Sequence, residues 1–238
     1  MTLHLLPSRA ASAAENMALD FLLLRRYPEV AVRFRHYDWH RPAFTFGYGQ
    51  KIAFVREQLP VDEAFDLCRR PTGGGLVDHR EDWTYSLVIP RGHAMEEERA
   101  TQSYRAVHEA LAKALRLQGA KAIVKESCEP AAEGQDCGVT GMCFQRAELY
   151  DVVHPRTGDK IAGAAQKRTK HGLLFQGSIA RAEAGAEVDW DQFGEDFAHE
   201  LGAILGCVAV ETPWPEFAEG EVDGLIEHYA STEWIEHR

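Results

Sequence analysis

Apolar side chains recur at every third or fourth position in several stretches of the chain, which is the spacing of a helix that buries one face. In residues 13–26 this face holds Met17 and Phe21, and Ser12 with Glu15 forms a capping box at its start. The same spacing predicts further helices over residues 101–118, 191–205 and 216–229.

Other stretches alternate apolar and polar residues, or form short apolar runs bounded by glycine and proline, which is typical of strands. The expected strands cover residues 32–37, 43–46, 65–70, 83–89 and 120–124. Residues 143–179 follow as a meander of three short strands with two turns. This mixture predicts an α+β fold: a single domain over residues 1–238, with helices flanking a largely antiparallel or mixed sheet.

Composition excludes several classes of protein. The chain has 26 Lys and Arg against 37 Asp and Glu, a net charge of −11, which argues against general nucleic-acid binding. No apolar run approaches the roughly 20 residues of a membrane span, and the N-terminus lacks the pattern of a secretory signal. We therefore expect a cytoplasmic protein with no nucleic-acid or membrane partner.

Residues 69–75 read Arg-Arg-Pro-Thr-Gly-Gly-Gly and are called here the glycine loop. Backbone N–H groups of Gly73, Gly74 and Gly75 could cradle a phosphate or a carbonyl oxygen, with Arg70 adding charge. An ordinary tight turn explains the same glycines equally well. The loop is not a Walker A motif, because Leu76 and Val77 replace its Gly-Lys-Ser/Thr ending.

Two residues could carry acid–base or nucleophilic chemistry. His79 follows the glycine loop and could act as a base or an orienting group, with Asp78 or Asp82 as its partner. Cys143 is either a small buried hydrophobe or a nucleophile activated by a nearby base or cation. The five cysteines are odd in number and include no CxxC pair, so we expect neither a disulfide framework nor a metal site.

Lys160 stands at the tip of a turn before a run of small residues that includes Gly163, Ala164 and Ala165. A strand with so little side-chain volume lets a ligand or another backbone approach closely. The lysine could then direct its ammonium at a carbonyl oxygen or phosphate above that floor, or it could be a solvated turn residue.

Basic residues cluster next to this run: Lys167, Arg168, Lys170 and His171. In an acidic chain such a cluster could dock an acidic partner. A solvated hairpin edge is the alternative.

Four segments together resemble the lipoate–protein ligase and octanoyltransferase family, whose fold is shared with biotin–protein ligases. They are Glu-Asn-Met-Ala-Leu-Asp at 15–20, Pro-Ala-Phe-Thr-Phe-Gly-Tyr at 42–48, the glycine loop with its extension to His79, and Gly-Asp-Lys-Ile-Ala-Gly-Ala-Ala-Gln at 158–166. They occur in the family's order and span most of the chain. The resemblance implies the family's cofactor-transferase fold.

The pair Cys143-Phe144 resembles the acyltransferase branch, in which this cysteine forms a thioester with octanoate, whereas ligases carry Asn-Asp there. The resemblance thus implies transfer of an octanoyl or lipoyl group to the lysine of a lipoyl carrier domain. Cys143 would hold the acyl group and Lys160 would stabilise the oxyanion. The walls of the acyl slot would be the glycine loop with Arg70 and His79 on one side, and Gly163, Ala164 and Ala165 on the other.

This route needs no cofactor. The alternatives are an ATP- and Mg-dependent lipoate ligase, in which Arg70 and the glycine loop hold the phosphates, and a non-catalytic acyl-binding relative. Expected partners are a carrier domain of the glycine-cleavage H protein or dehydrogenase E2 type, and an acyl carrier protein. We expect no C-terminal accessory domain. The chain departs from the family pattern at Arg80, Phe21 and the Phe175-Gln176 pair.

Overall fold

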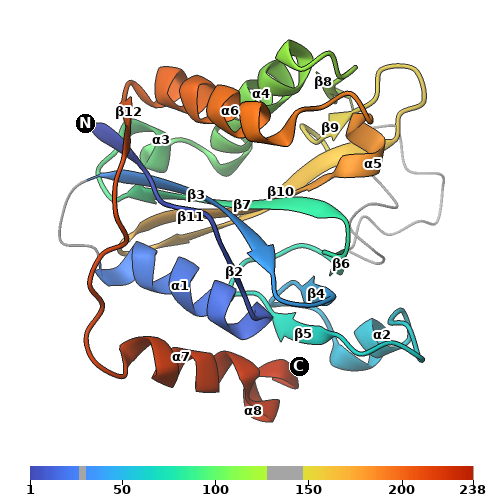
Figure 1. The fold of residues 1–238 in the computed structure, drawn as a ribbon, viewed down its shortest axis with the longest axis vertical. Helices are drawn as coiled ribbons and strands as arrows, with labels where there is room; N and C mark the ends of the chain where they lie inside the picture. The colour runs from blue at the N-terminus through green and yellow to red at the C-terminus, as the bar shows by residue number, and fades with distance from the viewer. Residues whose placement is uncertain (27–30, 128–146, 238) are drawn as a thin grey trace.

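The structure is a computed structural model that describes residues 1–26, 31–127 and 147–237. A large sheet forms its middle layer, with helices on both faces (Figure 1). One face is covered by α3 (Ala94–Glu97), α4 (Ala100–Leu117) and α6 (Trp190–Leu205). On the opposite face lies α1 (Ala13–Arg26), against which α7 (Glu221–Ala230) packs, followed by α8 (Thr232–Ile235).

Within the described residues the large sheet has nine strands. Their order is β12 (Val208–Glu211), β1 (Thr2–Leu5), β3 (Val32–Trp39), β7 (Asp82–Pro90), β11 (Gly172–Ala180), β10 (Lys160–Thr169), β9 (Val152–Val153) and β8 (Ile123–Val124), with β2 (Arg9–Ala11) beside β3. Strands β12, β1, β2 and β3 pair in parallel, and every pairing from β3 to β8 is antiparallel. The predicted α+β fold with a mixed, largely antiparallel sheet is confirmed.

A second, three-stranded sheet lies on the α1 side of the large sheet (Figure 1). It consists of β5 (Asp66–Arg69), β4 (Ala43–Phe46) and β6 (Val77–Asp78). The glycine loop joins β5 to β6. The remaining short helices are α2 (Ile52–Arg56) and α5 (Arg181–Ala184).

The main core fills the space between the large sheet and helices α4 and α6. Trp83 of β7 lies edge-on to Phe193, at 5.0 Å between ring centroids, and Phe197 contacts Phe34 and Tyr85 in the same manner. These side chains are at most 5% exposed. This well-packed half gives the sheet a rigid back, so that its other face can carry a pocket.

Helix α1 has the predicted bounds, and Ser12 Oγ accepts from the backbone N–H of Glu15 at 3.2 Å. The expected strand 120–124 is reduced to β8. The last predicted helix begins five residues late, because Gly220 at its N-cap has a φ of 73°. Within the described part of the chain, no helix combines the length and apolar character that crossing a membrane requires.

Candidate active site

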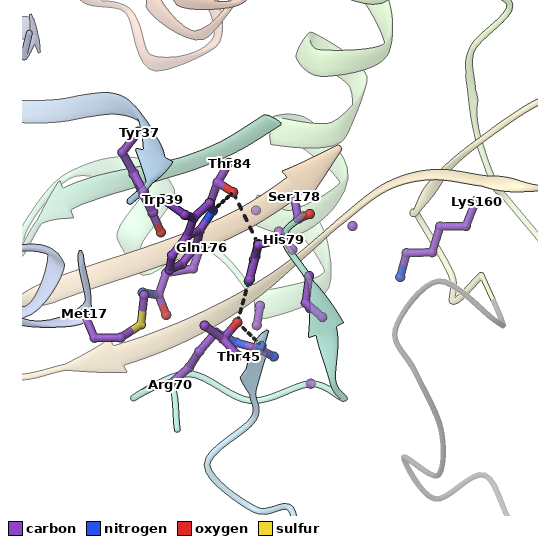
Figure 2. A pocket seen from close by; sticks show the side chains of 16 residues that line it. Met17, Tyr37, Trp39, Thr45, Arg70, His79, Thr84, Lys160, Gln176 and Ser178 are labelled. Atoms are coloured by element: carbon purple, nitrogen blue, oxygen red, sulfur yellow. Dashed lines mark hydrogen bonds between the residues drawn. The ribbon is translucent and has the colours of Figure 1, made fainter. Parts of the chain in front are cut away.

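A pocket opens between strands β10 and β11 of the large sheet on one side and the glycine loop with the small sheet on the other (Figure 2). Its lining residues are Met17, Tyr37, Trp39, Thr45, Arg70, Gly74, Val77, His79, Thr84, Lys160, Gly163, Ala164, Ala165, Gln176, Gly177 and Ser178. Strand β10 and the glycine loop therefore do lie on opposite walls of one cavity. Lys160 stands apart on one side, away from the cluster around His79 and Gln176 (Figure 2).

Lys160 is the first residue of β10, and its side chain is only 7% exposed. The expectation that it stands at the tip of a turn is wrong. The register of β10 against β9 shifts between Lys160 and Ala162, and such an irregularity redirects a side chain. The ammonium Nζ lies 2.8 Å from Oδ2 of Asp151, whose side chain is 1% exposed. A solvated turn lysine is thereby excluded.

Gly163 makes room for this ion pair. A Cβ at this position would lie 2.5 Å from both Cε and Nζ of Lys160, and 3.1 Å from an oxygen of Asp151. The neighbouring Ala164 and Ala165 complete a smooth stretch of pocket wall. Ala162 is instead fully buried in the main core, so the pocket wall formed by β10 begins at Gly163, as expected.

The two faces of β10 have different functions. The side chains of Gln166 and Arg168 point away from the pocket and contact α4. There Ser103 Oγ donates to Gln166 and accepts from Arg168. Lys167 points the other way, with its Nζ 5.1 Å from the ring centre of Tyr48. The basic cluster is therefore divided, because Arg168 ties β10 to α4 while Lys170 is exposed in the hairpin turn.

The glycine loop lies against the turn after β4. A Cβ on Gly47 would overlap the carbonyl oxygen of Gly74, so only glycine allows this approach. Arg70 shapes the loop from within, donating at 2.9 Å to the carbonyl oxygens of Gly73 and Gly75. Of the three glycines, only Gly74 lines the pocket and has a positive φ, 86°.

Arg69 points away from the pocket. Its guanidinium donates to the carbonyl oxygens of Tyr48, Gln50, Trp234 and Ile235, and it is fully buried. This arginine therefore anchors the C-terminal helices to the small sheet and adds no charge to the pocket.

His79 lines the pocket with both ring nitrogens engaged. Nε2 lies 2.6 Å from Thr45 Oγ1, and Nδ1 lies 2.7 Å from Asp82 Oδ2. Thr45 accepts in turn from Arg70 at 2.8 Å. Of the two partners considered for His79, Asp82 is the one observed. Asp78 instead pairs with Arg80 on the surface. With both nitrogens bonded, His79 suits an orienting role better than that of a base.

Gln176 connects α1 to the glycine loop across the pocket. Its Nε2 donates to Asp20 Oδ2 at 2.7 Å, and its Oε1 accepts from Thr72 Oγ1 at 2.8 Å. Asp20 also forms a buried ion pair with Arg35 at 2.8 Å. The departure from the family pattern at Gln176 therefore lies in the pocket wall itself.

Two cysteines belong to the described residues. Cys68 is buried in the small sheet, and burial raises the pKa of its thiol to about 12, which leaves it unreactive. Burial also raises the pKa of Cys207. The candidate nucleophile Cys143, together with Cys128 and Cys137, lies outside the described residues. Among the residues that are described, no group of His, Cys, Asp and Glu could hold a metal ion.

The model of the family called lipoyl protein ligase A/B catalytic domain matches residues 12–184, a segment that includes the glycine loop and the Lys160 strand. The chain belongs to this family.

Sequence relatives of this family member include octanoyltransferases LipM. The protein from Bacillus cereus is 32% identical over 196 residues, covering 80% of this chain and 67% of the relative. The protein from Oceanobacillus iheyensis is 34% identical over 170 residues, covering 70% of this chain and 59% of the relative. The alignment thus leaves a third or more of each relative's length unmatched.

Solved structures support the fold of this lipoyl ligase family member. A putative lipoate protein ligase from T. acidophilum with bound lipoic acid has a TM-score of 0.72 at 19% identity, covering the whole of both chains. A lipoate-protein ligase A bound with ATP also has a TM-score of 0.72, at 18% identity and 99% coverage of both. At this level of identity the likeness concerns the fold alone.

Sequence reasoning missed a set of pocket residues from α1, β3, β4, β7 and β11: Met17, Tyr37, Trp39, Thr45, Thr84 and Ser178. Most of them lie in apolar or alternating stretches that predicted core strands. The available signal was polarity, because Thr45, Thr84 and Ser178 interrupt otherwise apolar strands.

Proposed function

We propose that this chain is an acyltransferase of protein lipoylation, which transfers an octanoyl group to the lysine of a lipoyl carrier domain. The observation that carries the proposal is the buried Lys160 ammonium beside the smooth wall from Gly163 to Ala165, at one side of an apolar pocket. The similarity to octanoyltransferases LipM supports this acyl group and this reaction class.

In the proposed reaction the Cys143 thiolate attacks the carbonyl carbon of an acyl thioester on a carrier protein. A carbon–sulfur bond forms to Cys143, and the donor thiol leaves and takes up a proton. The amine of the acceptor lysine then attacks, loses a proton as the amide forms, and releases the Cys143 sulfur. Lys160 stabilises the oxyanion of both tetrahedral intermediates.

The substrates and cofactors follow from this chemistry. Because the thioester is already activated, neither ATP nor Mg is required. The acceptor is a carrier of the glycine-cleavage H protein or dehydrogenase E2 type, and the donor is an acyl carrier protein. The cytoplasmic location and the single-domain assignment remain predictions.

The engagement of Arg70 argues against the ligase alternative in its expected form. Three of its five N–H donors go to Thr45 and to two loop carbonyl oxygens, so this arginine is largely occupied in shaping the loop. The transferase proposal assigns it no phosphate.

Intact-protein mass spectrometry tests the proposal. After incubation with an octanoyl carrier thioester we expect a mass increase of one octanoyl group that hydroxylamine removes. The adduct is expected to vanish in Cys143→Ala and to persist in Cys207→Ala, the matched cysteine control. Release of pyrophosphate from ATP with free lipoate, and no adduct, would establish the ligase instead. Ligand binding with neither activity would indicate an acyl-binding protein.

A further inference from the structure

The carboxylate of Asp151 collects three hydrogen-bond donors from different parts of the chain. Lys160 Nζ lies 2.8 Å from Oδ2, the backbone N–H of Glu148 donates to Oδ2 at 2.7 Å, and the Tyr104 hydroxyl donates to Oδ1 at 2.6 Å. Asp151 is fully buried and does not line the pocket. We infer that Asp151 and Tyr104 are positioning residues, which hold the Lys160 ammonium at the acyl carbonyl. This inference rests on the proposed acyl transfer.

The corner that carries Asp151 is held in an unusual backbone conformation. Tyr150 has a φ of 68°, and among the described residues it is the only non-glycine with a positive φ. Its N–H donates to Lys125 at 2.8 Å, and its carbonyl oxygen lies 2.6 Å from Nδ1 of His108. Strained backbone that is fixed from several sides is typical of functional sites.

Helix α4 fixes this corner from behind. Tyr104 and His108 stand four residues apart, hence on one face of α4, and their rings lie 4.1 Å apart. The Tyr104 hydroxyl also accepts from the backbone N–H of Ala164 at 3.1 Å. One side chain therefore connects α4, the carboxylate of Asp151 and the pocket wall.

The hydroxyl of Tyr104 is suited to act as a permanent donor. Burial, followed by the neighbouring carboxylate of Asp151, raises the pKa of Tyr104 well above its ordinary value. The phenol thus stays protonated and continues to donate to Asp151 while it accepts from Ala164. Both oxygens of Asp151 and the Tyr104 hydroxyl have partners, and a satisfied buried cluster of this kind specifies one geometry. At its edge, Nε2 of His108 has no hydrogen-bond partner among the described residues.

Burying the charges of Lys160 and Asp151 costs desolvation free energy, which their mutual attraction must offset. Replacement of a buried ion pair by apolar side chains is often neutral or stabilising, so stability alone is a weak reason for the pair. What the pair provides is a fixed position for an ammonium group, with Gly163 leaving the room for it. A positioned charge is what stabilisation of an oxyanion requires.

Steady-state kinetics of octanoyl transfer separate positioning from folding. Asp151→Asn removes one of two acceptor oxygens, and we expect it to lower kcat about 10- to 100-fold, the range for a residue that orients a catalytic group through a hydrogen bond. Tyr104→Phe removes the hydrogen bond donated to the Asp151 carboxylate and the one accepted from Ala164, and we expect it to lower kcat about tenfold. KM for the donor should change little. Asp159→Asn, an exposed carboxylate next to Lys160 in sequence, is the matched control.

A double-mutant cycle with Lys160→Ala decides whether these residues act through the lysine. If they do, Asp151→Asn and Tyr104→Phe cause no further loss of kcat once Lys160 is absent. Multiplied losses in the double variants would overturn the inference, because the residues would then act on folding or on another group.

Nuclear magnetic resonance of protein with ¹⁵N-labelled lysine gives a readout that needs no turnover. The protons of the ammonium held by Asp151 should exchange slowly with water, so that its Nζ gives an observable signal. This signal is assigned to Lys160 by its absence in Lys160→Ala. We expect this signal in wild-type protein and Asp159→Asn, and not in Asp151→Asn. An unchanged signal in Asp151→Asn would contradict the positioning role. If the signal behaves as expected while no octanoyl adduct forms, the proposed function fails and the positioning of Lys160 stands.

Discussion

Two sides of the pocket use buried polar groups in different ways (Figure 2). On one side the ion pair between Lys160 and Asp151 places an ammonium group against a wall of small residues. On the other side His79 belongs to a hydrogen-bonded series in which Arg70 donates to Thr45, and the two ring nitrogens contact Thr45 and Asp82.

This difference distinguishes Lys160, which can act on a substrate, from the groups around His79, which shape the pocket wall. On the His79 side the polar atoms contact one another, and Asp82 also accepts from Thr84 and Ser178. Such a network rigidifies the wall and leaves an acyl chain to meet mainly carbon atoms. An ammonium group, in contrast, has three donors on a single nitrogen. The charge on the Lys160 side is therefore the natural partner of a developing oxyanion.

Lys160→Ala should produce the largest effect. Loss of one oxyanion donor typically slows the chemical step about 100- to 1,000-fold, and we expect a decrease in octanoyl transfer of this size. The exposed hairpin lysine provides the control Lys170→Ala. Near-normal transfer by folded Lys160→Ala protein, measured with saturating donor, would show that the Lys160 side acts on the substrate no more than the His79 side does.

Gly163→Ala sharpens the comparison by moving the lysine instead of deleting it. The new methyl group would overlap the end of the Lys160 side chain, which can yield only by shifting. A misplacement of about 1 Å can cost about 100-fold in rate. The control is Gly49→Ala, since no atom lies within 4 Å of the added Cβ. Equal transfer rates in the two variants would mean that the position of Lys160 is not critical.

The four longer helices, the central strands of the large sheet and the glycine loop could be predicted because they depend on local patterns. The capped, amphipathic segment that became α1 is one case. The short strands β1, β2 and β12 and the short helices α2, α3, α5 and α8 were not predicted. The partner of Lys160 could not be predicted, because their contact depends on a register shift in β10 and a positive φ at Tyr150. The spacing in residues 101–118 predicts the helix that carries Tyr104, and nothing in that spacing shows where its hydroxyl points.

The same limit applies to the His79 side. The sequence left Asp78 and Asp82 as equal candidates, and the structure pairs His79 with Asp82, whose carboxylate also accepts from Thr84 and Ser178. Arg69 and Arg70 are neighbours of identical type, yet strand alternation turns only Arg70 toward the pocket. Such choices follow from tertiary packing and not from residue type.

His79→Ala should affect stability more than chemistry. It removes the hydrogen bonds of the imidazole to Asp82 and Thr45, both of which keep other partners, and each lost bond costs about 0.5–1.5 kcal/mol of unfolding free energy. We expect a lower urea midpoint, and a KM for the donor that rises more than kcat falls. A loss in kcat as large as that of Lys160→Ala, with unchanged stability, would assign chemistry to this side.

Acidification should produce the smallest effect. Burial lowers the pKa of His108 below its ordinary value of 6.5, with Lys160 acting in the same direction, and burial also lowers the pKa of His36. Below about pH 6.5 the unfolded chain binds protons that the folded chain does not. The free energy of unfolding therefore decreases as the pH is lowered, by at most about 1.4 kcal/mol per pH unit for each histidine. His108→Gln should make this slope shallower in denaturation measured from pH 7 to 5. An unchanged slope would show that His108 takes no part in it.

The position of a bound acyl group tests the division between the two sides most directly. In a crystal structure with octanoate we expect a carboxylate oxygen within about 3 Å of Lys160 Nζ, and the hydrocarbon chain directed toward Met17 and Gln176. A carboxylate bound at Arg70 and His79, with the chain end next to Lys160, would contradict the account.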